Sequence, residues 1–477
     1  MSVDLGGESG RVMKVGYDGN NFYLDELYRF PNIPAFVNRT LYWDILRLWN
    51  EVIIGIEKGR LSKPSSMGID TWGCDFVLLD EHDNLLSNPV HHRDSRNAGI
   101  MEKVFLKVPK EEIFAQTGIQ FMSINTLYQI YSLVERQSSI LSIAETFLTP
   151  PDLLNFWLTG SKVCEFTSAT TTQMYNPFTN DWARSLINKL EIPEKIFPEV
   201  IQPGTKIGKY KSIDVITVAA HDTGSAVATV PSQSGNFAYI SSGTWSLVGM
   251  EVERPIINEN ALKANVTNEG GVYGTFRLLK NVIGLWILQE CRRTWESQGK
   301  KISYTDLMKM ASYEKPLRSF VVPNDPAFLY PGNHPDLIKN ICRNTSQPVP
   351  ETPGTTVRCV LESLALAYCD VIKSLVEISG RKVEVVHIVG GGSKNRLLNQ
   401  FTANATGLPV IAGPAEATVI GNSIVQLITL GELDSLKDAR QVIANMPELK
   451  HYEPKDERLW EEAYQRYKSI PVSDNKF

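Results

Sequence analysis

Alternating apolar and polar positions at the start of the chain predict strands joined by short turns. Val3 and Leu5 form a short apolar segment that runs into a glycine-rich loop, and the pattern resumes over residues 12–17. A turn over residues 18–21 precedes a third strand over residues 22–30. The pattern therefore predicts an antiparallel meander.

A helix and a buried strand are predicted next. Apolar residues between Thr40 and Lys58 recur at helical spacing, with Thr40 placed to cap the helix. Residues 66–70 form a buried-strand pattern, and residues 76–86 a hairpin. Strands crossed by a helix are typical of an α/β protein.

The second half of the chain repeats this plan. A strand over residues 237–240, a polar turn and a returning strand over residues 245–250 mirror residues 3–17. A helix from Val357 ends at Gly380, and a strand over residues 383–389 then leads into a glycine turn. The sequence therefore predicts two lobes of related topology, residues 1–233 and residues 234–477.

After the glycine turn, residues 396–406 are predicted to form a helix. A further helix is predicted over residues 280–295, where Asn281 and Gln289 are the polar members that would face a cleft.

Composition limits the classes of function. A length of 477 residues suits two or three lobes, and a net charge of −5 without a long basic tract argues against nucleic acid as a partner. No apolar run approaches the roughly 18 residues of a membrane helix, and the first residues do not resemble a signal peptide, so we expect a cytoplasmic protein without a membrane partner. The six cysteines form no Cys-x-x-Cys pair and are interpreted as reduced thiols. The sequence does not predict an oligomeric state.

Three polar, glycine-bearing turns follow predicted strands: residues 4–11, 242–246 and 390–393. Glycine lets backbone N–H groups approach phosphate oxygens, and Ser, Thr or Arg side chains add donors. Each turn alone is typical of a hairpin or a helix entry, but three in matching positions favour a nucleotide cleft. Neither a Gly-x-Gly-x-x-Gly nor a P-loop pattern is present.

Asp222 follows a buried-strand pattern over residues 215–220. In this position it is either the base that accepts a hydroxyl proton during phosphoryl transfer or the cap of a following helix. Asp4, beside the first glycine turn, is either a magnesium ligand through water or an ordinary turn aspartate. His91 and His92 are adjacent and alternate faces on an extended segment, which favours a structural or substrate-side role over metal binding.

Taken together, the motifs resemble the FGGY family of carbohydrate kinases over nearly the whole chain. The tryptophan-bearing segments are the specific ones, because the glycine turns also occur in the wider sugar kinase and actin superfamily. The segments that carry the resemblance are residues 3–6 with 9–11, 68–73 with 75–76, 93–96, 117–121, 125–129, 221–223, 241–246, 267–271, 279–281, 284–286 and 387–392.

This resemblance implies two ribonuclease-H-like lobes that close over ATP. Within the family, the closest likeness is to enzymes that use ATP and Mg²⁺ to phosphorylate L-rhamnulose at its 1-hydroxyl. Another deoxy-ketose such as L-fuculose, or a catalytically silent ATP-dependent sensor, stays open as an alternative. By the same resemblance Asp222 is the proton acceptor and joins the sugar contacts, which are Gly73, His221, Asp222, Thr223 and Asn281. The implied ATP contacts are Gly7, Glu8, Ser9, Gly10, Arg11, Thr244, Gln289 and Gly391.

Overall fold

A computed structural model describes residues 1–232 and 234–471 as a mixed α/β protein of two compact units. Unit 1 comprises residues 1–233, 251–278 and 417–446, and unit 2 comprises the remaining segments. Segments from the second half of the chain therefore fold with unit 1. The division at residue 233 stays a prediction for the two functional lobes.

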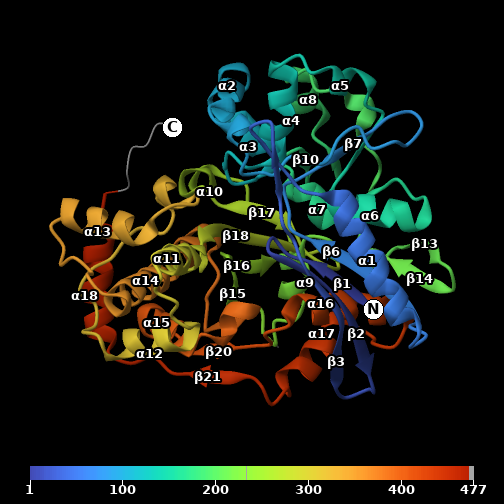
Figure 1. Cartoon of the computed structure of the whole chain (residues 1–477). Coiled ribbons are helices and arrows are strands. Elements are labelled where there is room, and N and C mark those ends of the chain that lie inside the picture. The colour runs from blue at the N-terminus through green and yellow to red at the C-terminus, as the bar shows by residue number, and fades with distance from the viewer. Residues whose placement is uncertain (233, 472–477) are drawn as a thin grey trace. The chain divides into compact units, whose positions relative to one another are not determined.

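Unit 1 contains a six-stranded sheet of order β13-β14-β6-β1-β2-β3 (Figure 1). The central strand β1 is antiparallel to β2 and parallel to β6. The bounds are β1 Ser2–Leu5, β2 Ser9–Tyr17, β3 Phe22–Pro31, β6 Ser66–Thr71, β13 Lys206–Tyr210 and β14 Ile213–Ile216. Helix α1, Ile45–Arg60, packs against β2 and β3 and covers their apolar side chains. The predicted meander is confirmed.

The other elements of unit 1 are short strand pairs and helices that surround this sheet. The pairs are β4 Ala35–Val37 with β5 Thr40–Tyr42, β7 Val77–Leu79 with β8 Thr146–Leu148, β9 Cys164–Glu165 with β12 Val200–Ile201, and β10 Tyr175–Asn176 with β11 Asp181–Trp182. The helices are α2 Ile100–Lys107, α3 Lys110–Thr117, α4 Thr126–Glu135, α5 Ser139–Ile143, α6 Pro150–Thr159, α7 Phe166–Thr171, α8 Arg184–Lys189, α9 Asp222–Ala228, α10 Glu259–Ala264, α16 Ala417–Leu430 and α17 Leu436–Ala444.

The second large sheet has the order β17-β18-β16-β15-β19-β20-β21. Its strand β15 is antiparallel to β16 and parallel to β19, which repeats the arrangement of β1, β2 and β6. The bounds are β15 Phe237–Ser242, β16 Trp245–Val252, β17 Thr267–Gly270, β18 Phe276–Ile283, β19 Val385–Val389, β20 Val410–Ala412 and β21 Lys450–Tyr452. The predicted repeat of topology is confirmed at the level of strand pairing.

The part of unit 2 that the structure describes contains six α-helices, and the longest of these, α14, packs against α12 and α15. Helix α14 begins in a reciprocal cap between Thr352 and Thr355 and ends at Gly380, whose φ of 66° suits glycine. The predicted stop at Gly380 is confirmed. The bounds are α11 Trp286–Ser297, α12 Tyr304–Tyr313, α13 His334–Asn344, α14 Pro353–Ser379, α15 Arg396–Thr406 and α18 Glu457–Lys468.

Two local predictions are wrong, and a third is confirmed only in part. Thr40 lies on strand β5, and α1 is capped by Asp44, whose side chain accepts from the Arg47 amide. The predicted hairpin over residues 76–86 is confirmed around its turn, where the Asp80 amide donates to the Asn84 carbonyl at 3.1 Å, the Leu86 amide donates to the Leu78 carbonyl at 3.0 Å and a bridge joins Leu79 to Leu85. The regular strand β7 also pairs with the distant β8, which the pattern did not predict. The strand before Asp222 ends at Ile216.

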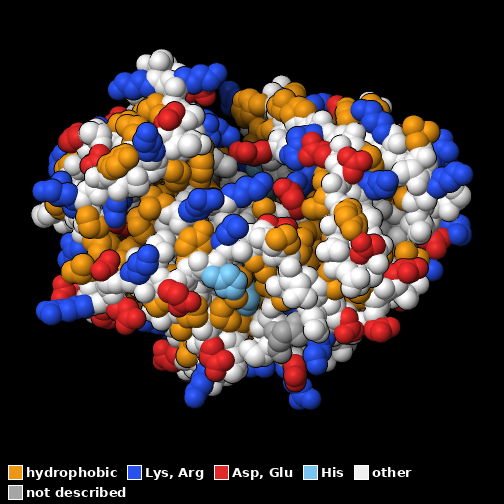
Figure 2. All heavy atoms as spheres, turned by 90° about the horizontal axis from the view of Figure 1, so that it is seen from below, with side chains coloured by type: hydrophobic (Ala, Val, Ile, Leu, Met, Phe, Trp, Pro, Cys, Tyr) orange, Lys and Arg blue, Asp and Glu red, His pale blue; other side chains and the backbone are white. Residues whose placement is uncertain are grey.

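On the face shown in Figure 2, Lys and Arg side chains are intermingled with Asp and Glu, and apolar side chains are scattered among them. None of the helices within residues 1–232 and 234–471 is long and apolar enough to cross a membrane.

Candidate active site

Three aspartates of unit 1 converge where neighbouring strands end. Asp4 on β1 lies opposite Asp70 on the parallel strand β6. Thr71, which ends β6, forms a bridge with His221, the residue before Asp222. Burial raises the pKa of Asp70 and of Asp222, and the negative charge of Asp4 raises both further. The three carboxylates therefore interact electrostatically.

Asp222 is the first residue of α9, and its side chain is 30% exposed. The Thr223 hydroxyl donates to Asp222 Oδ1 at 3.1 Å, and His221 Nε2 lies 3.6 Å from the same oxygen. His221 occupies the N-cap position, and no side chain caps this helix. The capping alternative for Asp222 is therefore wrong. Its raised pKa makes its carboxylate a stronger base than an ordinary aspartate.

Gly73 lies directly against the imidazole of His221. A Cβ added to Gly73 would lie 3.2 Å from His221 Nε2 and 3.3 Å from the adjacent ring carbon. Only a residue without a side chain fits this approach without displacing the ring. The structure thus brings together four of the predicted sugar contacts, Gly73, His221, Asp222 and Thr223, within unit 1.

The first glycine turn joins β1 to β2 as a hairpin closed by a hydrogen bond from the Gly6 amide to the Ser9 carbonyl at 2.9 Å. Gly7 and Glu8 at its tip are exposed, and a Cβ on Gly7 would meet nothing within 4 Å. Gly10, by contrast, would place a Cβ 2.4 Å from the Phe30 ring. Gly7 is therefore free to face a ligand, whereas the need for glycine at position 10 comes from packing.

Arg11, the last residue of this predicted nucleotide loop, pairs with Asp4. Its Nε and Nη2 atoms lie 2.9 and 2.7 Å from Asp4 Oδ2. The ion pair holds the Asp4 carboxylate in place beside Asp70 and Asp222.

In unit 2 the two other glycine turns pack against each other. A Cβ on Gly392 would lie 2.0 Å from Ser242 Oγ, and one on Gly390 would lie 3.2 Å from the Ser242 carbonyl oxygen. Gly284 is also enclosed, since its Cβ would lie 2.6 Å from Ser246 Oγ. The turns after β15 and β19 thus form one backbone-lined corner.

Three predicted ATP contacts border this corner. The Thr244 carbonyl accepts from the amides of Gly284 at 3.1 Å and Trp286 at 3.2 Å, which attaches the turn to the start of α11. Gln289, one turn further along α11, has a buried Oε1 without a hydrogen-bond partner in the described part of the chain. A Cβ on Gly391 would meet nothing within 4 Å. An unsatisfied acceptor beside open backbone fits a nucleotide, which supplies hydrogen-bond donors.

Asn281 lies on a strand, not on the predicted helix. Strand β18 runs to Ile283, and α11 begins only at Trp286, after Gly284 interrupts the pattern. The Asn281 carbonyl accepts from Asn324 Nδ2 at 2.9 Å. Asn281 belongs to unit 2, whereas the other predicted sugar contacts belong to unit 1.

Asp70 was missed by the sequence analysis as a site residue. It is fully buried, Oδ2 accepts from Asn422 Nδ2 on α16, and Oδ1 has no hydrogen-bond partner among residues 1–232 and 234–471. A cation suits such an oxygen, and Mg²⁺ usually takes one or two carboxylates and several waters. Within the same residues no group of three or more His, Cys, Asp or Glu side chains is arranged to hold a metal. The residues present thus fit a magnesium ion that arrives with phosphate, not a site made only of protein ligands.

The adjacent histidines belong to an aromatic cluster around Asp75. Asp75 Oδ2 accepts from the indoles of Trp43 and Trp72, each at 2.7 Å, and lies 2.9 Å from His92 Nδ1. The His91 ring stacks on Trp43 with ring centroids 4.2 Å apart, and burial lowers the pKa of His91 to about 3. Trp72 directly precedes Gly73, so this cluster supports the loop that contacts His221.

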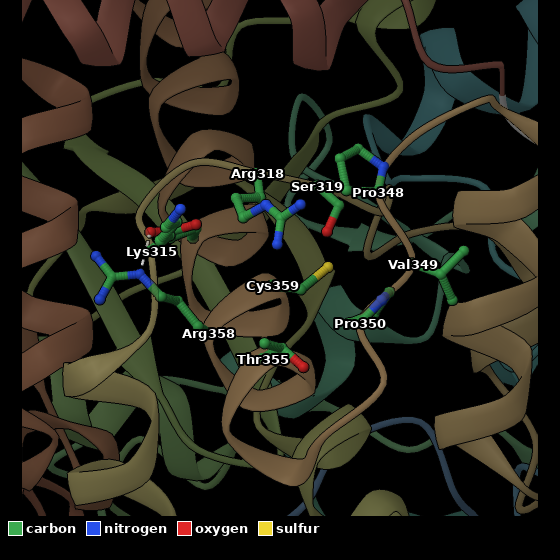
Figure 3. Close-up of a pocket in the computed structure, with 10 residues that line it drawn as sticks. Lys315, Arg318, Ser319, Pro348, Val349, Pro350, Thr355, Arg358 and Cys359 are labelled. Atoms are coloured by element: carbon green, nitrogen blue, oxygen red, sulfur yellow. Dashed lines mark hydrogen bonds and ion pairs between the residues drawn. The ribbon is translucent and has the colours of Figure 1, made fainter.

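Two surface pockets lie apart from these residues. One, in unit 2, has a cavity volume of about 20 Å³ and is lined by Arg318, Ser319, Arg358 and Cys359 among others (Figure 3). It holds at most one or two water molecules. The other, in unit 1, has a volume of about 370 Å³ and is lined by Phe166, Tyr273 and Phe276 among others. None of the predicted site residues lines either pocket.

Family models match both halves of the chain. The N-terminal domain of the FGGY family of carbohydrate kinases matches residues 3–229, and the C-terminal domain of that family matches residues 238–430. The chain belongs to the FGGY family of carbohydrate kinases. It is therefore a sugar kinase, a phosphotransferase of a family that uses ATP and usually Mg²⁺.

Curated relatives match the FGGY kinase over its length. A rhamnulokinase of Bacteroides thetaiotaomicron is 43% identical, with 98% of each chain covered. A rhamnulokinase of Halalkalibacterium halodurans is 42% identical, with 95% of this chain and 98% of the other covered.

Solved structures share the fold at low identity. A ligand-bound xylulose kinase of Lactobacillus acidophilus has a TM-score of 0.80 at 16% identity, with 98% of each chain covered. A glycerol kinase of Plasmodium falciparum with ADP has a TM-score of 0.77 at 16% identity, with 98% of this chain and 97% of the other covered. The predicted fold of ribonuclease-H-like, actin-related sugar kinases is confirmed.

Proposed function

We propose that this FGGY kinase transfers the γ-phosphoryl group of ATP to the 1-hydroxyl of L-rhamnulose, giving L-rhamnulose 1-phosphate and ADP. The substrate rests on the relatives named rhamnulokinase, which are 42% and 43% identical over at least 95% of the chain. The reaction rests on one structural observation: Asp222, with a raised pKa, lies beside the three other sugar contacts of unit 1.

In this proposal Asp222 accepts the hydroxyl proton while Gly73, His221 and Thr223 hold the sugar, with Asn281 as a further contact. Phosphoryl transfer depends on positioning and on stabilisation of charge more than on the strength of the base. The ordering of His221 and Thr223 around one carboxylate oxygen serves the positioning.

ATP is proposed to contact the two backbone regions that offer open glycine: residues 7–11 of unit 1, and Thr244, Gln289 and Gly391 of unit 2. Mg²⁺, when bound, neutralises charge on the phosphate oxygens, and Asp4 would hold it through water beside Asp70. We place the protein in the cytoplasm, which accords with its six free cysteines.

A coupled assay of ADP release tests the proposal. The protein is incubated with MgATP and either L-rhamnulose, L-fuculose or no sugar, and the phosphorylated carbon is identified by NMR of the product. We expect rapid ADP release with L-rhamnulose and phosphate on carbon 1. Preference for L-fuculose would reassign the substrate, and ADP release that no sugar accelerates would favour a silent sensor.

A further inference from the structure

A guanidinium group is buried directly behind the proposed sugar site. Arg277, on β18, has a fully buried side chain in unit 1. Its Nε donates to the Gly270 carbonyl at 2.8 Å, and Nη2 lies 3.2 Å from Glu269 Oε2. Burying an ion pair costs desolvation energy that apolar side chains of similar volume would avoid. Such a pair beside a proposed active site points to a role beyond packing.

Two groups of opposite character face Nδ1 of the His221 ring, the Arg277 guanidinium and the Glu269 carboxylate. Arg277 Nη2 donates to His221 Nδ1 at 3.4 Å. An arginine side chain has only donors and stays protonated, so the nitrogen that faces it must present a lone pair. When Nδ1 accepts from Arg277, the proton of a neutral ring is on Nε2. Glu269 balances the charge of Arg277 and, at 3.4 Å from the same Nδ1, is the group that would favour the opposite tautomer.

The protonated nitrogen faces the proposed chemistry. His221 Nε2 lies 3.6 Å from Asp222 Oδ1 and beside the backbone of Gly73. An N–H group at this position can donate to a sugar oxygen next to the base.

We propose that Arg277 is a positioning residue that fixes His221 as the neutral Nε2–H tautomer, so that the ring donates to the sugar next to Asp222. Glu269 serves as the counter-ion that allows the guanidinium to be buried. The inference deepens the proposed function and rests on its assignment of His221 to the sugar.

The tautomer can be observed without any turnover. Protein labelled with ¹⁵N at histidine is studied by long-range ¹H–¹⁵N NMR, and the His221 signals are assigned by their loss in His221→Gln. We expect a protonated Nε2 in the wild type and a shift of the proton toward Nδ1 in Arg277→Met, where Glu269 is left alone at that nitrogen. A wild-type ring protonated on Nδ1, or an unchanged pattern in Arg277→Met, would overturn the inference.

Kinetics separate positioning from structural support. Arg277→Met should raise the KM for the sugar by about two- to tenfold, the loss expected for one hydrogen bond, with the KM for ATP unchanged. Arg277→Lys, which keeps a charged donor and guards against failure of the methionine variant to fold, should restore most of the sugar affinity. Loss of thermal stability with an unchanged sugar KM in both variants would reduce Arg277 to a packing role.

A matched control is another arginine–glutamate pair, Arg358 and the buried Glu362 of α14, with Nε and Oε1 2.7 Å apart. Arg358→Met should lower thermal stability and leave the sugar KM and the His221 signals unchanged. If the wild type does not phosphorylate L-rhamnulose, the proposed function fails, and the NMR experiment still decides the tautomer.

Discussion

The three aspartates of unit 1, Asp4, Asp70 and Asp222, and the glycine turns after β15 and β19 in unit 2 are built on opposite principles. Around Asp222 the chain uses charged side chains, held by the ion pairs of Arg11 and Arg277. Around Ser242 it uses glycine, so that backbone segments approach where any Cβ would collide. Substitutions should therefore change the chemistry and pH dependence of the first region, and ligand affinity or packing in the second.

The largest effect is expected from Asp222→Asn. Removing the proton acceptor should lower kcat by about 10²- to 10⁴-fold, the usual contribution of a general base, and should leave ATP binding nearly intact. Stopped-flow or steady-state kinetics and calorimetric titration with ATP measure the two quantities. Turnover close to that of the wild type would remove Asp222 from the role of base.

A second prediction concerns Glu165, which supports the loop before Asp222. Glu165 Oε2 accepts from the amides of Thr167 at 2.9 Å, Ser168 at 3.2 Å and Ala220 at 3.0 Å. Burial nevertheless raises the pKa of Glu165 to about 8. The folded state thus retains a proton that the unfolded state releases near pH 4.5. The resulting stabilisation is full below pH 4.5 and is lost as the pH rises toward 8.

Glu165→Gln keeps a neutral side chain at every pH and removes this dependence. Relative to the variant, the unfolding free energy of the wild type should fall by about 1.4 kcal/mol per pH unit between pH 4.5 and 8. Chemical denaturation across this range measures the difference, with exposed Glu81→Gln as the control. Parallel pH profiles for wild type and Glu165→Gln would mean that the carboxylate is ionised when folded.

The smallest effects are expected on ATP affinity, from substitutions in the glycine turns of unit 2. Gly391→Val should weaken ATP binding about tenfold or more, because the valine side chain would occupy space proposed for the nucleotide. Thermal stability should change little, because a Cβ at Gly391 meets no atom within 4 Å. Thr244→Val, which removes one hydroxyl donor, should weaken ATP about two- to tenfold. Calorimetric titration gives both affinities. Equal ATP affinity in wild type and both variants would restrict these turns to a structural role.

Gly392→Ala is the control for this pair. Its new Cβ would collide with Ser242 Oγ, so the melting temperature should fall by an amount that Gly391→Val does not show.

Local patterns predicted most of the large elements, because their signals lie within a few residues. The hairpin of β1 and β2, the buried strand β6 and the Gly380 stop of α14 all follow from alternation, apolar runs and capping. The turn after Phe76 was predicted, but the pairing of β7 with a strand that begins at Thr146 could not be, because that strand is distant in sequence. The predicted helix over residues 280–295 began too early because its first residues belong to β18.

The site was predicted in part, through motifs whose residues are close in sequence. The grouping of His221, Asp222 and Thr223 needed no structure, whereas their approach to Gly73 depends on pairing of Thr71 with His221 across the fold. Arg277 carried an unused signal: a single arginine in the apolar stretch Phe276-Arg277-Leu278-Leu279 is costly to bury without a partner. Which partner it meets is not readable from spacing alone.

The enclosure of Gly284 and Gly392 has an evolutionary consequence. Every amino-acid replacement at these positions adds at least a Cβ, and that atom would fall within 2.6 Å of Ser246 Oγ in one case and 2.0 Å of Ser242 Oγ in the other. Neither position can drift by small steps, because even alanine, the smallest change, already collides. We therefore expect glycine at both positions in functional relatives, whereas a substitution at the open Gly391 is limited only by the proposed nucleotide contact.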